Sequence, residues 1–207
     1  KENLDPNITV FWTGYNTIAE YIPNHDGENA LQYFGHELLL WDNYPVDDMN
    51  QDLLFMGPLK NRGNQLHQSH IGYVANPMIQ WSLSKIPLLT MSEYMWSPET
   101  YNAEKSYQKA ISKFTKTKKM ANAIKNLLEN FKYSLISYDT IPEIEQMIKQ
   151  KNLLGIHLYY QSLLKDVEII QEFNDQRFLA QFAPWIKRLL LDQKIVANIY
   201  NNNFEEA

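Results

Sequence analysis

The side chains best suited to chemistry follow two predicted strands. Trp41, Asn43 and Asp48 lie in the segment 41–48 (WDNYPVDD), and Asn76 follows the next strand along the chain. If these strands are parallel, their carboxyl ends meet at one rim of the sheet, where βα architectures place their reacting groups. An indole stacks on the C–H face of a sugar ring, while carboxylate and amide groups bind its hydroxyls. The pattern therefore indicates a sugar site, although Asn, Asp and Pro are also ordinary turn and capping residues.

Three short apolar runs predict the strands that would position these side chains. They are residues 8–12 (ITVFW), 37–41 (ELLLW) and 71–75 (IGYVA), each with the length and composition of a buried strand. Helices are predicted within residues 18–34, with interruptions at Pro23 and Gly27, and at residues 78–85. Continuous apolar strands separated by helices favour an α/β fold with a parallel sheet covered on both faces.

The length of this α/β part limits its architecture. An eight-unit βα barrel takes about 250 residues, or about 30 for each unit, so residues 1–96 hold about three units. Three parallel strands cannot close a barrel, and their outer edges would expose unpaired backbone groups. We therefore expect residues 1–96 to form a partial barrel that needs either more chain or a partner.

The remaining residues, 97–207, are predicted to form an all-α helical bundle. Apolar residues recur at helical spacing in residues 103–114, 121–133, 153–173 and 176–200, and a further helix should start at Thr140, with Thr140 as its cap. Pro184 predicts a kink or a short break in the last helix. Because the periodicity and the charge both change near residues 96–98, we place a domain boundary there.

The composition excludes several classes of protein. Of the 207 residues, 44% are hydrophobic and 13% aromatic, which argues against disorder. The net charge of −5 argues against a general nucleic-acid binder, which needs surplus Lys and Arg. The absence of cysteine removes disulfides, thiolate metal sites and cysteine nucleophiles, and leaves the compartment undetermined. No stretch reaches the roughly 18–20 apolar residues of a membrane span.

Four segments together resemble glycoside hydrolase family 84. They are residues 12–14 (WTG), 41–48 (WDNYPVDD), 54–58 (LFMGP) and 76–78 (NPM), and the continuation through residue 98 fits as well. This family contains the β-N-acetylglucosaminidases, including the O-GlcNAcases, and bacterial proteins often labelled hyaluronidases. The resemblance implies the last three or so βα units of a (β/α)8 (TIM) barrel, followed by the family's helical domain.

The resemblance also implies roles for four residues. Trp41 matches a tryptophan that helps to wall the pocket around the N-acetyl group, and Asn43 an asparagine near the acetamide and the glycosidic bond. Asp48 matches an aspartate that binds the hydroxyls at the far edge of the sugar, and Asn76 an asparagine that also holds ring hydroxyls. Asp47 stands where relatives often have Asn, so a second charge beside Asp48 should raise one of the two pKa values.

The family's reaction uses the 2-acetamido group of the substrate as nucleophile and retains configuration. One aspartate of an adjacent pair orients the acetamide, and the other acts as general acid and then base. In family order this pair precedes the segment 12–14, so we expect no catalytic residue in this chain. Asp47-Asp48 is no substitute, because its flanking residues match the sugar-binding motif. The resemblance implies no cofactor and no metal.

Two hypotheses follow for the whole chain. The first is a C-terminal piece of a β-N-acetylglucosaminidase, inactive by itself, that begins at Lys1 inside a longer protein. Its expected partners are a glycan or glycoprotein containing N-acetylglucosamine, the missing N-terminal part of the barrel and a second copy bound through the helical domain. The alternative is a non-catalytic helical interaction or dimerisation module with a barrel remnant. The localisation is undetermined, and secretion or the cell surface is favoured if the protein is bacterial.

Three other patterns have simpler interpretations. His67 and His70 could form a metal pair, but a solvated loop is favoured because no clear third ligand is present. The lysines of residues 105–132 could contact an acidic partner, although a solvated helix face is favoured. The aromatic residues Tyr159, Tyr160, Phe178, Phe182 and Trp185 could form a partner surface, but we expect them in the core of the bundle.

Overall fold

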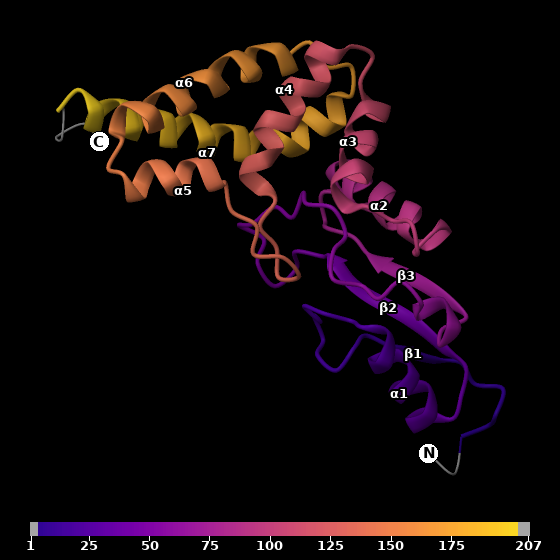
Figure 1. Ribbon diagram of the computed structural model, residues 1–207. Helices are drawn as coiled ribbons and strands as arrows, with labels where there is room; N and C mark the ends of the chain where they lie inside the picture. The colour runs from indigo at the N-terminus through magenta and orange to yellow at the C-terminus, as the bar shows by residue number, and fades with distance from the viewer. Residues whose placement is uncertain (1–3, 203–207) are drawn as a thin grey trace. The chain divides into compact units, whose positions relative to one another are not determined.

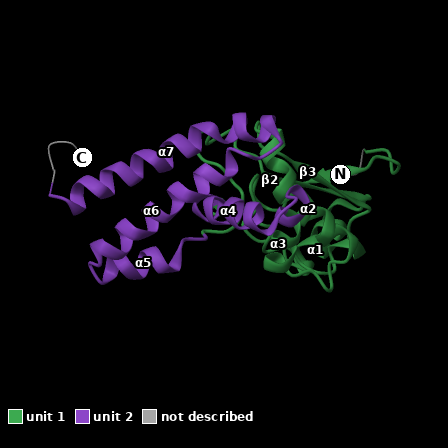
Figure 2. Ribbon diagram, turned by 90° about the horizontal axis from the view of Figure 1, so that it is seen from above, with its two compact units in different colours: residues 1–110, 132–138 green, residues 111–131, 139–207 purple. Residues whose placement is uncertain are grey.

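The structure is a computed structural model, and it describes residues 4–202 (Figure 1). The chain is divided into two compact units (Figure 2). Unit 1 extends to Ala110 and includes Lys132–Tyr138, whereas unit 2 comprises Ile111–Phe131 and the residues from Asp139 onward. The boundary at residues 96–98 between a barrel part and a helical domain stays a prediction. Within residues 4–202, no helix combines the length and the apolar character that a membrane crossing requires.

Unit 1 is a mixed α/β structure around a three-stranded parallel sheet of order β1-β2-β3. Its elements are β1 (Val10–Trp12), α1 (Asn24–Phe34), β2 (Leu38–Pro45), η1 (Leu66–Gln68), β3 (Gly72–Asn76), α2 (Trp81–Trp96) and the first part of α3 (Ala103–Phe114). The three predicted strands and their parallel direction are therefore confirmed. β2 continues past residue 41 to Pro45, so that Trp41 and Asn43 lie within the strand.

The two predicted helices of unit 1 have different bounds in the structure. α1 begins directly after Pro23, which is extended (ψ 162°), and ends where Gly35 adopts the left-handed φ of 65° that favours glycine. Gly27 does not interrupt this helix, since it is buried within it. α2 runs on to Trp96 through Pro87, whose side chain is buried in unit 1.

One face of the sheet is covered by helices and forms the core of unit 1. Trp12, Leu38 and Leu40 pack together with Ala30 of α1 and Leu66 of η1. On the same face, the ring of Tyr73, which pairs with Leu40 in register, lies 5.9 Å from the ring of Tyr94 on α2. Burial of these side chains is the main contribution to the stability of the sheet.

The opposite face of the sheet is open among the described residues. Phe11 is 58% exposed there, and Leu39, Trp41 and Val74 are only partly buried. Side chains alternate between the faces of a strand, so these residues share one side. The prediction of a sheet covered on both faces is therefore wrong for the described residues, because α1 and α2 both pack against the other face.

A buried ion pair holds the covered face of β2. The side chains of Asp42 and Arg62 are 2% and 1% exposed, and the guanidinium donates two hydrogen bonds to the carboxylate, at 2.6 and 2.8 Å. The Tyr73 hydroxyl also donates to Asp42, and Arg62 Nη1 donates to the backbone carbonyl of Glu20 at 3.1 Å. A buried charge is tolerated only when it is paired in this way.

The segment Lys132–Tyr138 belongs to unit 1 through two close contacts with the segment that follows β2. Asn61 Nδ2 donates to the carbonyl of Ile136 at 2.6 Å. A Cβ atom at Gly57 would lie 2.8 Å from the carbonyl oxygen of Lys132, so a larger side chain would push the two backbones apart. Residues 54–58 (LFMGP), one of the four segments that carry the family resemblance, are therefore buried where two parts of the backbone approach closely.

Unit 2 consists of helices, with a core of aromatic and aliphatic residues. They are the last part of α3, α4 (Lys118–Leu128), η2 (Glu129–Phe131), α5 (Pro142–Lys149), α6 (Leu153–Ile170) and α7 (Gln176–Tyr200). α6 packs against α4, α5 and α7. Phe178 and Phe182 are buried, as predicted, whereas Tyr159, Tyr160 and Trp185 are partly buried.

Two details of the predicted helices differ in unit 2. The cap of α5 is Ile141 and not Thr140, and no side chain provides a capping hydrogen bond there. Pro142 at the first helical position explains the start, because its fixed φ suits a helix and its missing N–H needs no partner. α7 continues without a break through Pro184.

Asp42→Ala should destabilise the protein by about 3–5 kcal/mol, because it leaves the Arg62 guanidinium buried and unpaired. Chemical unfolding of the whole chain measures this loss. Asp192→Ala is the matched control, since it removes the Arg188–Asp192 pair of α7, in which the side chains are 72% and 24% exposed, and should cost about 1 kcal/mol or less. Equal losses in the two variants would contradict a special role of the buried pair.

Candidate functional site

Three of the four predicted site residues meet at the carboxyl edge of the sheet. The indole Nε1 of Trp41 donates to Asn43 Oδ1 at 2.8 Å, and Asn76 Nδ2 donates to the same oxygen at 3.0 Å. Asn43 Nδ2 in turn donates to the backbone carbonyl of Thr17 at 2.5 Å. The Asn43 amide thus joins β2, β3 and the loop that follows β1.

An irregularity in β2 brings Asn43 to this position. Asp42 pairs with Ala75, but the next pair in the ladder is Pro45 with Asn76. β2 therefore has residues between these pairs that β3 does not match, as in a β-bulge. Bulges re-aim side chains and are frequent beside active sites.

An aromatic surface lies beside these amides on the open face of the sheet. The rings of Phe11 and Trp41 are 5.8 Å apart and meet edge to face at 68°. Trp41 is partly exposed, and its N–H is held by Asn43, so the plane of the indole is fixed. A fixed, accessible indole next to amide groups can stack on a sugar ring while the amides bind its polar groups.

Asp48, the fourth predicted residue, is exposed in a turn that follows β2. The turn is closed by a hydrogen bond from the N–H of Asn50 to the carbonyl of Asp47, at 2.9 Å. Asp48 makes no hydrogen bond to any of the described residues, and its carboxylate is therefore available to a ligand. The binding role of the four residues stays a prediction.

Asp47, beside it, is in a very different environment. It is 1% exposed, and its Oδ1 accepts a hydrogen bond from the N–H of Ile79 at 3.1 Å. Burial raises the pKa of Asp47, the hydrogen bond from Ile79 lowers it, and the charge of Asp48 raises it by a smaller amount. The predicted direction of the pKa shift is confirmed, but the main cause is burial and not the neighbouring charge.

The structure separates Asp42 from this site, although it lies between two site residues in the sequence. Its side chain points to the covered face and binds Arg62. Nothing in the sequence marks Arg62 as buried, because a single arginine in a polar segment has no periodicity. The acidic residue between Trp41 and Asn43 is therefore structural.

The two histidines considered as a metal pair have different environments. His67 is about half-exposed and lies 3.6 Å from Glu99. His70 is buried, not solvated as predicted: its ring stacks on Trp12 at 5.3 Å, and Nδ1 lies 2.9 Å from Ser69 Oγ. Across residues 4–202, no group of three His, Asp or Glu side chains is placed to hold a metal ion.

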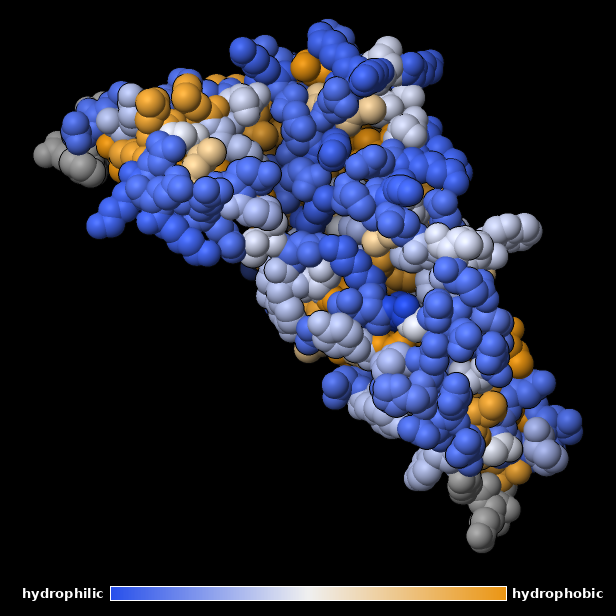
Figure 3. Space-filling model, in the orientation of Figure 1, coloured by the Kyte–Doolittle hydropathy of each residue, from blue (hydrophilic) through white to orange (hydrophobic). Residues whose placement is uncertain are grey.

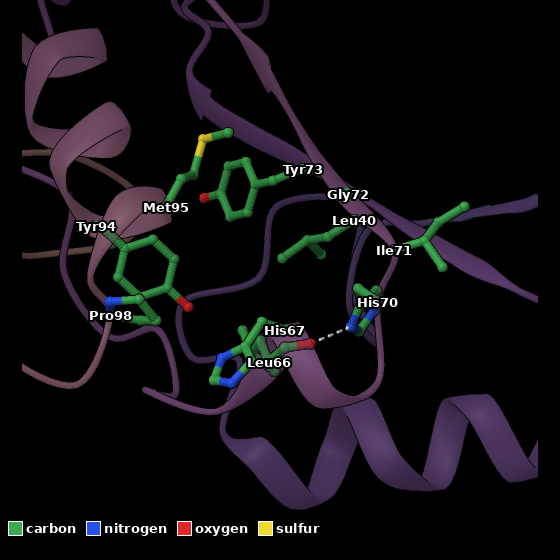
Figure 4. A pocket seen from close by; sticks show the side chains of 10 residues that line it. All are labelled: Leu40, Leu66, His67, His70, Ile71, Gly72, Tyr73, Tyr94, Met95 and Pro98. Carbon is green, nitrogen blue, oxygen red and sulfur yellow. Dashed lines mark hydrogen bonds between the residues drawn. The ribbon is translucent and has the colours of Figure 1, made fainter.

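The structure has a cavity of about 210 Å³ elsewhere in unit 1, and Figure 4 shows the residues that line it. Its lining includes Gly72 and Ile71 at the amino end of β3, whereas Asn76 ends the same strand. Tyr73 and Tyr94 line it from the helix-covered side, and their hydroxyls donate to Asp42 and to the Gly63 carbonyl. Ile71 and Met95 in its lining are exposed, so the cavity opens to solvent, and it is lined by none of the four predicted site residues.

Asp47→Asn should stabilise the folded protein increasingly as the pH rises. The pKa of Asp47 in the folded protein is raised above its ordinary value of 3.8. The wild type therefore loses stability as the pH rises from about 3.8 through the pKa of Asp47 in the folded state. Asn has no proton to lose, so the difference in free energy of unfolding between variant and wild type grows over this range and then levels off. Urea unfolding at several pH values measures it, and a difference independent of pH would contradict the raised pKa.

Comparison with known proteins identifies the sequence family. Residues 1–129 match the family described as β-N-acetylglucosaminidase (NAGidase). The chain is 29% identical over 93 residues to the protein O-GlcNAcases of Rattus norvegicus and Mus musculus. These matches cover 45% of the chain and 10% of the length of each relative.

Solved structures share the fold. An O-GlcNAc hydrolase mutant of Thermobaculum terrenum has a TM-score of 0.84 at 24% identity, covering 95% of this chain and 45% of that protein. CpGH84B has a TM-score of 0.83 at 23% identity, covering 99% of this chain and 40% of that protein. The chain thus spans less than half the length of either solved structure. With the family match over residues 1–129, these findings show that the chain belongs to the β-N-acetylglucosaminidases of glycoside hydrolase family 84.

Proposed function

We propose that this chain supplies the sugar-binding side of a retaining, substrate-assisted β-N-acetylglucosaminidase that hydrolyses terminal N-acetylglucosaminides. The observation that carries the proposal is the hydrogen-bonded group of Trp41, Asn43 and Asn76 at the carboxyl edge of the sheet. The substrate is a glycan or glycoprotein containing N-acetylglucosamine. The relatives named protein O-GlcNAcase support a glycoprotein.

Each residue has a role that suits its environment. The fixed indole of Trp41 walls the pocket beside the N-acetyl group, and Asn43 lies near the acetamide. Asn76 and the exposed carboxylate of Asp48 bind ring hydroxyls. Because the acetamide of the substrate is the nucleophile in this reaction, the binding side must hold the sugar with that group directed at the anomeric carbon.

We place the acid/base pair outside the 207 residues. Asp47-Asp48 is the only adjacent aspartate pair in the sequence, and Asp47 is buried with its carboxylate directed at the backbone of Ile79. Such a carboxylate can neither orient an acetamide nor protonate a leaving group. We therefore propose that this chain is inactive by itself.

The open face of the sheet supports a partial barrel. The inner face of a (β/α)8 barrel is filled by side chains from all eight strands, and where such side chains would pack, Phe11 is exposed and Trp41 only partly buried. Among the described residues, β1 and β3 each pair with β2 alone. Residues 1–96 are then the last βα units of the barrel, followed by a helical domain over residues 97–207.

In the longer enzyme that contains these residues, Asp48→Ala should reduce kcat/KM for an aryl N-acetylglucosaminide by about ten- to hundredfold. Hydrogen bonds to a charged acceptor contribute about 1.5–3 kcal/mol, and a factor of ten corresponds to about 1.4 kcal/mol. Steady-state kinetics measure the loss, while unfolding of the helical part should be unchanged. Asp52→Ala, in the same loop, is the control and should leave the kinetics unaltered.

Two outcomes would contradict the proposal. Wild-type kinetics in Asp48→Ala would favour the alternative, a non-catalytic module with a barrel remnant. Hydrolysis by the purified 207-residue chain would show that the acid/base groups lie within it.

Exposed hydrophobic side chains on unit 2 support a second role, formation of a homodimer through the helices. Leu154 and Leu158 of α6 are 49% and 53% exposed, and Leu191 and Ile195 of α7 are 48% and 40% exposed. Each pair is spaced by four residues and therefore shares one helix face. Figure 3 shows hydrophobic side chains on the surface of this part of unit 2.

The 207-residue chain should have twice its monomer mass of 24.4 kDa by light scattering. The double variant Leu154→Glu, Leu158→Glu should be monomeric, because charge at an apolar contact is strongly unfavourable. Gln161→Glu, which adds charge at an exposed position of the same helix, is the control. A monomeric wild type would contradict this role.

A further inference from the structure

Asp48 differs from the other proposed site residues in how it is held. Trp41, Asn43 and Asn76 are joined by hydrogen bonds between their side chains. Asp48 is exposed and makes no hydrogen bond within residues 4–202. Its position therefore depends on the backbone of the turn that carries it.

That turn is anchored by the residue before it. Asp47 is buried, and its Oδ1 accepts the N–H of Ile79 at 3.1 Å. Its carbonyl oxygen accepts the N–H of Asn50 at 2.9 Å, which closes the turn around Asp48. Asp47 thus has two structural roles. Its backbone carbonyl closes the turn, and its side chain binds the turn to the loop that contains Ile79.

The loop to which Asp47 binds is itself rigidly held. It follows Asn76 directly, and the N–H of Met78 donates to Ser84 Oγ of α2 at 3.1 Å. The sulfur of Met78, a buried residue, accepts the N–H of Phe55 at 3.4 Å. This second contact also joins the loop after β2 to the loop after β3. The Asp47 carboxylate therefore binds a loop that is itself held in place.

We infer that Asp47 is a positioning residue, whose carboxylate joins the turn bearing Asp48 to the loop after Asn76 and so places the Asp48 carboxylate at the sugar. This inference rests on the proposed function. Asp47 itself does not touch the sugar, because its side chain is buried. Any side chain that accepts the Ile79 N–H from this position can do the same, and the amide oxygen of Asn meets that requirement.

The test is a double-mutant cycle in the longer enzyme, with KM and kcat for an aryl N-acetylglucosaminide as readouts. Asp47→Ala should raise KM by about two- to tenfold, since a single hydrogen bond contributes about 0.5–1.5 kcal/mol. Asp47→Asn should return KM to within about twofold of wild type. In an Asp48→Ala background, Asp47→Ala should add no further increase, because its effect is exerted through Asp48.

The possible results separate the inference from the proposed function. A wild-type KM in Asp47→Ala, or an equal KM increase with Asp48 present and absent, would overturn the inference while Asp48→Ala remains impaired. Wild-type kinetics in Asp48→Ala would overturn the proposed function and this inference with it. Asp47→Val, which fills more of the buried space than alanine and cannot accept the Ile79 N–H, takes the place of Asp47→Ala if the alanine variant does not fold.

Discussion

The carboxyl half of β2 is the constraint on which the rest of unit 1 depends, because neighbouring residues there face opposite sides of the sheet. Asp42 points into the core and is held by the Arg62 guanidinium at 2.6 and 2.8 Å. Trp41 and Asn43 point to the open side and bind each other. An unpaired charge in the core would be costly, so the ion pair fixes the rotation and register of the strand. The same constraint sets the direction of the indole and the amide on the other face.

Beyond the strand, a series of hydrogen bonds connects the loops of the site to one another. Asn43 binds the loop after β1 through the Thr17 carbonyl and β3 through Asn76. Asp47 then binds the loop after β3 through Ile79. Each loop is thus hydrogen-bonded to a neighbouring element. Loops that are held in this way on a rigid scaffold can keep a binding geometry. Burial raises the pKa of the Asp47 carboxyl, because the charged form is desolvated there.

Sequence analysis predicted the elements of unit 1 better than their details. The three strands were recognisable because each is a short apolar run, and parallel strands were enough to predict that Trp41, Asn43 and Asn76 lie at one edge of the sheet. The irregularity of β2 at Asn43 was not predictable, because it depends on how two strands pair and not on the composition of either. The burial of Arg62 depends on a partner twenty positions away in the chain, and no local pattern contains that information.

The open face of the sheet connects these observations to the proposed architecture. Phe11 is 58% exposed on a strand whose other face is packed. Burying a fully exposed side chain of this kind contributes about 1.5–3 kcal/mol, so covering the rest of Phe11 would contribute about half of that. One face of this sheet is packed by helices, and the open face is mainly apolar. A solvated antiparallel sheet differs, because its exposed side is polar. The sheet of unit 1 has the form expected of one sector of a barrel, whose inner side chains pack against those of the remaining strands. On the proposed function, completing that face would bring the acid/base pair of the other strands opposite Trp41 and Asn43, so that stability and catalysis would depend on the same contact.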